Sequence, residues 1–177
     1  MVEERLAILD GVAKEVASLP EDAGSKVKAL AAELENERKR SLLLERELSR
    51  KIADSLLEQA EQVSGITVLS ARVPSLSMPV LREAGDMLRD RLKSAIVVLA
   101  TIYNGKPNFL AMVTSDLVAK GFNAGDIIKQ VAKVAGGGGG GKASMAQAGG
   151  KDASKIDEAL KLVKSIVASQ AKQARKV

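Results

Sequence analysis

The residues most able to do chemistry lie between Gly136 and Gly150, where six consecutive glycines precede Lys142, a Met-Ala-Gln-Ala segment and a second glycine pair. A glycine inside a helix or strand is unfavourable by roughly 0.5–1 kcal/mol relative to Ala. In a folded loop, a backbone without side chains can approach a ligand and direct several N–H groups at one anion. We therefore predict a glycine-rich loop at residues 136–142 that binds phosphate groups between flanking lysines. A mobile surface tether is the alternative interpretation.

The predicted anion site combines the loop amides with nearby side chains. Gln147 is the one side chain of its segment that can both donate and accept hydrogen bonds. Lys129 and Lys133 lie four residues apart, on one face of the helix that leads into the glycines. Solvated helix lysines, and a glutamine bonded only to its own loop, are the alternative interpretations. The predicted RNA-binding residues are Lys129, Lys133, Gly137, Gly138, Gly139, Gly140, Gly141, Lys142, Gln147, Gly149, Gly150 and Lys151.

Catalytic chemistry is not indicated. The glycine run matches the first seven places of the nucleotide-binding P-loop, but Ala143 stands where a hydroxyl should bind Mg²⁺, and a helix precedes the run instead of a strand. Asp116 and Asp126 have ordinary places in a turn and at a helix start. The sequence has no His and no Cys, which excludes imidazole catalysis, thiolate metal sites and disulfides. The segment is therefore predicted to bind a partner, with no catalytic residue, metal or cofactor of its own.

Charge is unevenly distributed along the chain. Residues 1–63 contain 10 Lys and Arg against 14 Asp and Glu, a net charge of −4, whereas residues 64–177 contain 17 against 8, a net charge of +9. A positive field favours a polyanionic partner. With a single Tyr and two Phe, stacking on single strands is not indicated, and recognition of structured RNA through its phosphates and shape is predicted. No signal peptide or membrane-spanning run is visible, so a cytoplasmic protein without a membrane partner is expected.

Two amphipathic helices are predicted before residue 64. Val2, Leu6 and Leu9 begin the apolar face of a short helix that ends before Pro20. A longer helix extends to about Val63, and polar residues interrupt the middle of its apolar stripe, which argues against an uninterrupted coiled coil. We predict an antiparallel helical hairpin over residues 1–63, with the first helix packed on the first half of the second.

The pattern changes after Gly65 to one typical of a mixed fold. β-Branched and alternating residues predict strands, and Asn104-Gly105 is the strongest hairpin signal. The element order is β-α-β-β-α-loop-β-α, which predicts an α/β (α+β) fold with a small mixed sheet of about four strands and packed helices. The globular domain is assigned to residues 64–177. The expected strands are residues 66–73, 95–103, 108–115 and 145–148, and the expected helices begin near residues 77, 123 and 152.

Several strings of residues resemble the C-terminal domain of alanyl-tRNA synthetases. The principal one is the glycine run followed by a basic residue and Met145-Ala-Gln-Ala-Gly-Gly150. Leu88-Arg-Asp-Arg-Leu-Lys93, Asn104-Gly-Lys and Ala124-Gly-Asp126 are similar as well. The likeness covers about residues 66–170, and this globular part is also similar to the substrate-binding domains of Asp-His-His phosphoesterases.

The resemblance implies that the chain binds the outer corner of tRNA-Ala and contributes to a homodimer. It also implies that the chain helps to present one tRNA to aminoacylation and editing sites in other domains of a parent ligase, which would use ATP and Mg²⁺. Family members commonly carry Arg-Pro-Asp where this sequence has Lys142-Ala-Ser144, so the positive charge is kept but the proline and the carboxylate are not. Two alternatives stay open: a self-association module with little tRNA binding, and the substrate-binding half of an Asp-His-His phosphoesterase.

Overall fold

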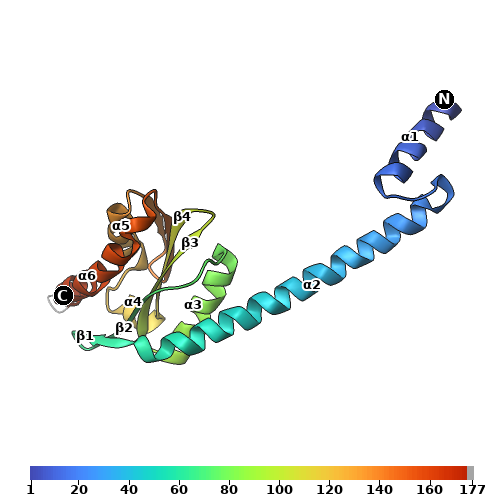
Figure 1. Ribbon diagram of the computed structural model, residues 1–177. Coiled ribbons are helices and arrows are strands. Elements are labelled where there is room, and N and C mark those ends of the chain that lie inside the picture. The colour runs from blue at the N-terminus through green and yellow to red at the C-terminus, as the bar shows by residue number, and fades with distance from the viewer. Residues whose placement is uncertain (175–177) are drawn as a thin grey trace. The chain divides into compact units, whose positions relative to one another are not determined.

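The structure is a computed structural model that describes residues 1–174, and the chain divides into two compact units, Met1–Glu45 and Arg46–Val177 (Figure 1). In the N-terminal unit, helix α1 (Val2–Glu15) is followed by a 3-10 turn, η1 (Pro20–Asp22), and by the first part of helix α2 (Ala23–Leu56). The helical character predicted for this region is therefore confirmed.

The predicted packing of the first helix along the second is not found in the described residues. The apolar side chains of α1 that would form such an interface, Leu6 and Leu9 among them, are exposed. Leu30 and Leu34 in the first half of α2 are exposed as well. The apolar stripe is sufficient to form each helix, but within the N-terminal unit only small side chains such as Ala13 and Ala23 are buried, and the leucines stay exposed.

The division between the units falls inside α2 and not near residue 64, because the last turns of α2 belong to the globular core. Ile52, Ala53 and Leu56 are buried in a cluster with residues of α3 and the sheet. The buried Ser49 hydroxyl also donates a 3.1 Å hydrogen bond to the carbonyl oxygen of Val80. These contacts fix the C-terminal part of α2 to the globular unit.

The globular unit contains one six-stranded mixed sheet with strand order β1-β2-β3-β4-β6-β5. Strands β2 and β3 are parallel and every other neighbouring pair is antiparallel. The α/β class is confirmed, and two short edge strands add to the four expected strands. Its further elements are η2 (Leu57–Gln59), β1 (Glu61–Val63), β2 (Ile66–Arg72), α3 (Met78–Leu92), β3 (Ala95–Tyr103), β4 (Lys106–Val113), α4 (Ser115–Ala119), α5 (Ala124–Val134), β5 (Gly138–Gly141), β6 (Met145–Gly149), η3 (Ala153–Lys155) and α6 (Ile156–Ala174).

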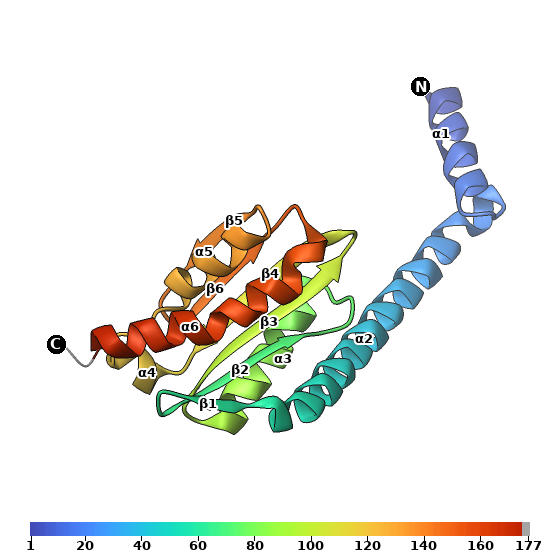
Figure 2. The same ribbon diagram turned by 60° about the vertical axis from the view of Figure 1, so that its left-hand side comes forward.

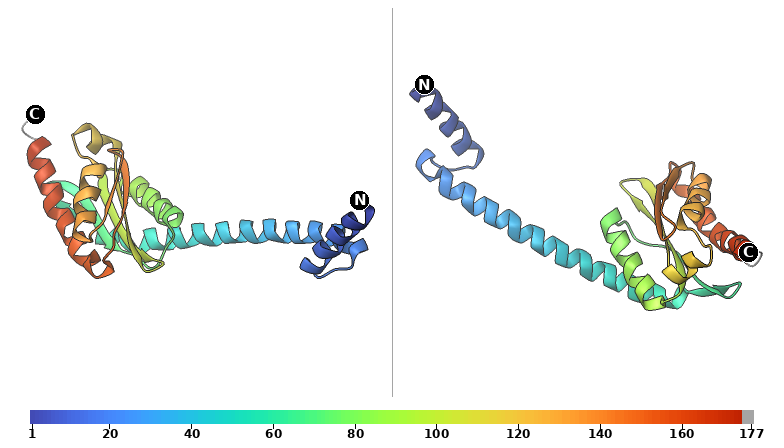
Figure 3. Two further views of the ribbon diagram at one scale, coloured as in Figure 1. Left: turned by 90° about the horizontal axis from the view of Figure 1, so that it is seen from above. Right: turned by 180° about the vertical axis from the view of Figure 1, so that it is seen from behind.

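Helices cover both faces of this sheet, with α3 on one side and α5 and α6 on the other (Figure 3). Because side chains alternate along a strand, β3 supplies both cores. Ile96 and Val98 pack toward α5 and α6, whereas Val97 and Leu99 pack toward α3. Burial on both faces thus explains why nearly every residue of β3 is apolar.

The turn between β3 and β4 is the one that the sequence predicts. Asn104 and Gly105 both have positive φ angles, 51° and 73°, as the tight two-residue hairpin turn requires. The register pairs Tyr103 with Lys106 and Phe109 with Ala100. This hairpin forms the centre of the sheet and gives β6 its partner strand.

Candidate nucleic-acid interface

The glycine run is an edge strand and not the loop predicted for residues 136–142. Gly138–Gly141 form β5, which pairs antiparallel with β6 (Figure 2). The two backbones approach so closely that alternate positions exclude a side chain. A Cβ atom on Gly137 or Gly139 would overlap the backbone of β6, and one on Gly141 would lie 2.5 Å from the carbonyl oxygen of Met145. Strand contact, not ligand access, therefore requires these three glycines.

The backbone amides around the run are largely used within the protein. The Gly137 amide donates to Ala132 and the Lys142 amide to Met145, both over 2.9 Å. The Gly150 amide donates to Pro107 over 2.9 Å, and the Lys151 amide to Ala135 over 2.8 Å. These four amides are therefore not free to form the predicted cradle, because pairing with β6 and closure onto α5 and β4 already satisfy them.

Side chains on β6 alternate between the two faces of the sheet. Ala146 and Ala148 are buried toward α5, whereas Met145, Gln147 and Gly149 are exposed on the face that carries α3. The Gln147 side chain accepts hydrogen bonds at Oε1 from two nitrogens of Arg82 on α3, Nε at 3.1 Å and Nη2. Arg82, which the sequence did not single out, thus joins the predicted site.

Lys129 approaches the same place from the other side of the edge strand. Its Cε atom lies 3.9 Å from the position that a Cβ on Gly140 would occupy, and Gly140 is paired with Gln147. Lys129, Gly140, Gln147 and Arg82 are therefore consecutive neighbours across β5 and β6. We call these four residues the β5–β6 strip. It has a cation at each end and a carboxamide between them.

The other predicted residues are distributed around this strip. Lys142 lies in the turn that joins β5 to β6, and Lys151 follows β6. Gly138 is exposed on the open side of β5, where an added Cβ would meet no atom within 4 Å. Lys133 instead lines a groove of about 520 Å³ between α5 and α6, beside Leu162 and Ile166. The structure therefore brings Lys129 to the glycine strand but places Lys133 at the α5–α6 groove.

Gly149 and Gly150 end β6 in different surroundings. A Cβ on Gly149 would only touch Asn108 and Pro107, at 3.9 and 4.0 Å. A Cβ on Gly150 would lie 2.8 Å from the ring of Pro107 and 2.9 Å from the side chain of Ala135. Gly150 is thus required by packing, whereas Gly149 is exposed and has room for a side chain.

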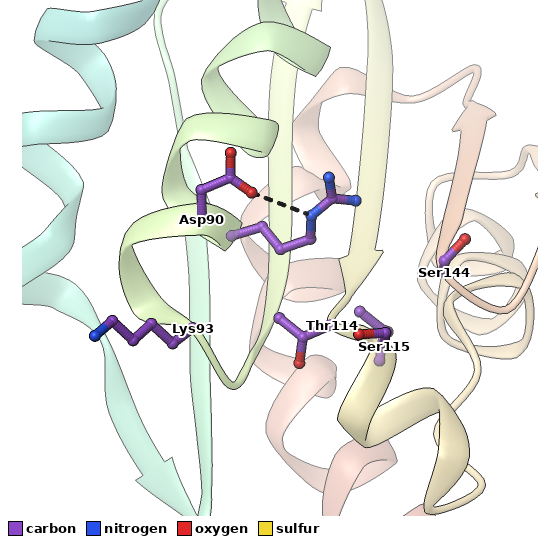
Figure 4. A pocket seen from close by; sticks show the side chains of 7 residues that line it. Asp90, Lys93, Thr114, Ser115 and Ser144 are labelled. Carbon is purple, nitrogen blue, oxygen red and sulfur yellow. Dashed lines mark ion pairs between the residues drawn. The ribbon is translucent and has the colours of Figure 1, made fainter.

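A second concave region lies where α3 ends beside Ser144 (Figure 4). It has a volume of about 630 Å³ and is lined by Arg89, Asp90, Lys93, Val113, Thr114, Ser115 and Ser144. Arg89 pairs with Asp86 at 2.8 Å and with Asp90 at 3.9 Å, so its charge is offset by two carboxylates. Lys93 extends away from Thr114 and Ser115 (Figure 4). This pocket therefore has less to attract an anion than the β5–β6 strip.

The acidic residues near these sites have structural roles. Ser94 donates a 2.5 Å hydrogen bond to Asp116, and this bond, with one from Thr114, lowers the pKa of the Asp116 carboxyl. Asp126 lies in the first turn of α5, and its amide donates to the capping side chain of Asn123. Among residues 1–174, no group of three or more carboxylates is arranged to hold a metal ion, and no helix is long and apolar enough to cross a bilayer.

Comparison with known proteins identifies the family to which the globular unit belongs. A family model described as the DHHA1 domain matches residues 65–169, more than half of the chain. This chain belongs to the DHHA1 domain family. The matched range of this DHHA1 domain includes the sheet from β2 to β6 and all the helices that pack on it except the end of α2 and the last residues of α6.

Curated relatives of this DHHA1 domain include alanine–tRNA ligases. The ligase of Dehalococcoides mccartyi (strain CBDB1) is 44% identical over 165 residues, which is 93% of this chain and 19% of the relative. That of Acetivibrio thermocellus is 42% identical over 168 residues, 95% of this chain and 19% of the relative. The chain therefore spans about a fifth of the length of these relatives.

One solved structure gives the same result. The C-Ala domain from Aquifex aeolicus alanyl-tRNA synthetase is 38% identical, with a TM-score of 0.57, and the match covers 62% of this chain and 97% of that domain. The resemblance to the C-terminal domain of alanyl-tRNA synthetases is thus confirmed. A second solved structure, a DHH domain described as a member of a family of ribosomal proteins, is 14% identical with a TM-score of 0.51. The match covers 85% of this chain and 34% of that one. At this low identity, the likeness shows a shared fold alone.

Proposed function

We propose that this chain is the tRNA-binding and assembly part of an alanine–tRNA ligase. In this role it holds the outer corner of tRNA-Ala and links aminoacylation with editing, while other domains of the ligase carry the reaction and use ATP and Mg²⁺. The observation that carries the proposal is that a DHHA1 domain related to these ligases presents the β5–β6 strip, with Lys129 and Arg82 at its ends. The relatives do not favour the Asp-His-His phosphoesterase alternative.

The charge of the globular unit supports a nucleic-acid partner. Residues 46–177 contain 20 Lys and Arg against 12 Asp and Glu, a net charge of +8. Such a field attracts the phosphate backbone and makes binding depend on salt. The described face of β5 and β6 offers no aromatic side chain for stacking, so contacts to phosphate and ribose fit this surface better than stacking on bases.

The test is a filter-binding titration of the chain with a tRNA-Ala transcript over a range of salt concentrations. If Lys129 contacts a phosphate, Lys129→Ala makes the plot of log affinity against log salt shallower by roughly one unit. Lys161→Ala is the matched control, because Lys161 is an exposed lysine on α6. Absence of wild-type binding at low salt contradicts the proposed function, and equal slopes for both variants contradict the assignment of the strip.

Self-association is a second candidate function, and exposed apolar residues of α2 support it. Leu30, Leu34 and Leu44 are exposed, although a leucine stripe of this kind is normally buried against a partner. A homodimer joined through these helices would also serve assembly of the ligase. Sedimentation of the whole chain and of residues 46–177 tests this: a dimer is expected only for the whole chain, and the same oligomeric state for both contradicts it.

A further inference from the structure

Arg82 stands out among the residues of the globular unit because it bonds to a predicted binding residue from a different element. Both of its hydrogen bonds to Gln147 end on the same atom, Oε1, and the two residues are 65 positions apart in the sequence. Arginine has no acceptor, so only the oxygen of the carboxamide can face it. The oxygen of the Gln147 carboxamide therefore points toward Arg82 and α3.

The consequence is that Gln147 presents its nitrogen outward. A carboxamide oxygen has two acceptor sites, and Arg82 occupies them with Nε and Nη2. Within residues 1–174, no acceptor takes a hydrogen bond from the Gln147 nitrogen, so both of its N–H groups are available on an exposed side chain. Without Arg82, the same amide could rotate and offer either end to a ligand.

The surroundings leave this donor accessible. Gly140 lies opposite Gln147 on β5 and has no side chain, and Gly138, on the same side of β5, has open space around it. Residues directly paired across an antiparallel ladder share one face of the sheet, so these glycines leave a low surface next to the carboxamide. Lys129 and Arg82 lie at the two ends of this surface and favour an anionic acceptor.

We propose that Arg82 is a positioning residue that holds the Gln147 carboxamide as a hydrogen-bond donor to a phosphodiester oxygen of the bound RNA. This inference rests on the proposed function, because it names a contact within the same binding site. The guanidinium acts through two fixed bonds, so a lysine, which keeps the charge but lacks the planar fork, does not replace it.

The experiment is a double-mutant cycle with Arg82→Lys and Gln147→Ala, measured as the affinity for a tRNA-Ala transcript. Gln147→Ala is expected to weaken binding about tenfold, as is usual for a lost hydrogen bond to a charged group. Arg82→Lys is expected to weaken binding by about the same factor, and to add little when Gln147 is already Ala. Arg91→Lys is the matched control on α3, because Arg91 pairs with Asp54 and is expected to leave affinity unchanged.

A measurement without RNA separates this inference from the proposed function. In the free wild-type protein, NMR relaxation of the Gln147 side-chain NH₂ group is expected to show restricted motion. In Arg82→Lys, the same group is expected to be more mobile. Equal mobility in both proteins overturns the positioning role whether or not RNA binds. If wild type binds tRNA-Ala, an unchanged affinity of Gln147→Ala, or additive effects in the cycle, also overturns it. Absence of wild-type binding refutes the proposed function, and the NMR comparison still decides the role of Arg82.

Discussion

The two kinds of glycine in β5 are expected to respond oppositely to the same substitution. Gly139 faces β6, where an added methyl group would overlap the backbone of Gln147 and both Cα and Cβ of Ala148. Gly138 is its neighbour in the strand, and an added methyl group there meets no atom within 4 Å. Gly139→Ala and Gly138→Ala therefore make the same chemical change in one strand, with and without a clash.

The magnitudes follow from what the methyl group meets. Overpacking costs typically about 1–3 kcal/mol, and a clash with backbone cannot be relieved by rotating a side chain, so we expect about 3 kcal/mol for Gly139→Ala. In a chain of this size that lowers the melting temperature by roughly 6–12 °C. Gly138 has no positive φ, so Ala there is expected to be neutral or to stabilise by about 0.4–1 kcal/mol through the unfolded state.

Tyrosine fluorescence is a suitable assay, because the chain has one Tyr, Tyr103, and no Trp, so the signal reports on the globular unit alone. Urea titrations of wild type, Gly139→Ala and Gly138→Ala give the free energies of unfolding. Equal losses in the two variants would refute the conclusion that close contact with β6 is what requires glycine. A neutral Gly139→Ala would refute the pairing of β5 with β6 itself.

Two further predictions concern the buried end of α2 and the hydrogen bond between Ser94 and Asp116. Leu56→Ala is expected to lower the unfolding free energy by about 2–4 kcal/mol, because Leu56 is only 5% exposed in the core. Leu44 is 57% exposed, so Leu44→Ala is expected to change the unfolding free energy by no more than about 0.5 kcal/mol. Both are measured by Tyr103 fluorescence at low protein concentration. Equal effects would contradict the division within α2. The depressed pKa of Asp116 contributes stability that is present above its unfolded-state value near 3.8 and is lost as the pH falls through the lower folded-state value. Ser94→Ala removes the main cause of that shift, so its acid unfolding midpoint should move to higher pH, and an unchanged midpoint in acid titrations would contradict this role of the hydrogen bond.

Local signals were sufficient for the elements whose structure is decided by neighbours in the sequence. The Asn104-Gly105 turn, the strand at 95–103 and the Asn123 cap each depend on residues within a few positions. The boundary between the two units, which falls within α2, could not be predicted in this way, because the same apolar stripe is buried at Ile52 and exposed at Leu44. Periodicity shows which face of a helix is apolar, but it does not show what covers that face.

The candidate site was only partly predictable for the same reason. Glycine propensity favours a loop at residues 138–141, yet close approach of β6 overrides it, and the approach depends on β6 itself being placed by β4. Gln147 and Lys129 were predicted from their types and positions. Arg82 was missed because nothing near it in the sequence distinguishes it from the other arginines of α3, and its contact with Gln147 joins two distant segments.

The most direct test of RNA binding at the β5–β6 strip is an NMR titration of the ¹⁵N-labelled chain with tRNA-Ala. The expected result is that the backbone signals of Gly138 and Gly140, and the side-chain NH₂ signal of Gln147, change most as the complex forms. Changes confined to the α5–α6 groove near Leu162 and Ile166, or to the N-terminal unit, would contradict that location of the binding site.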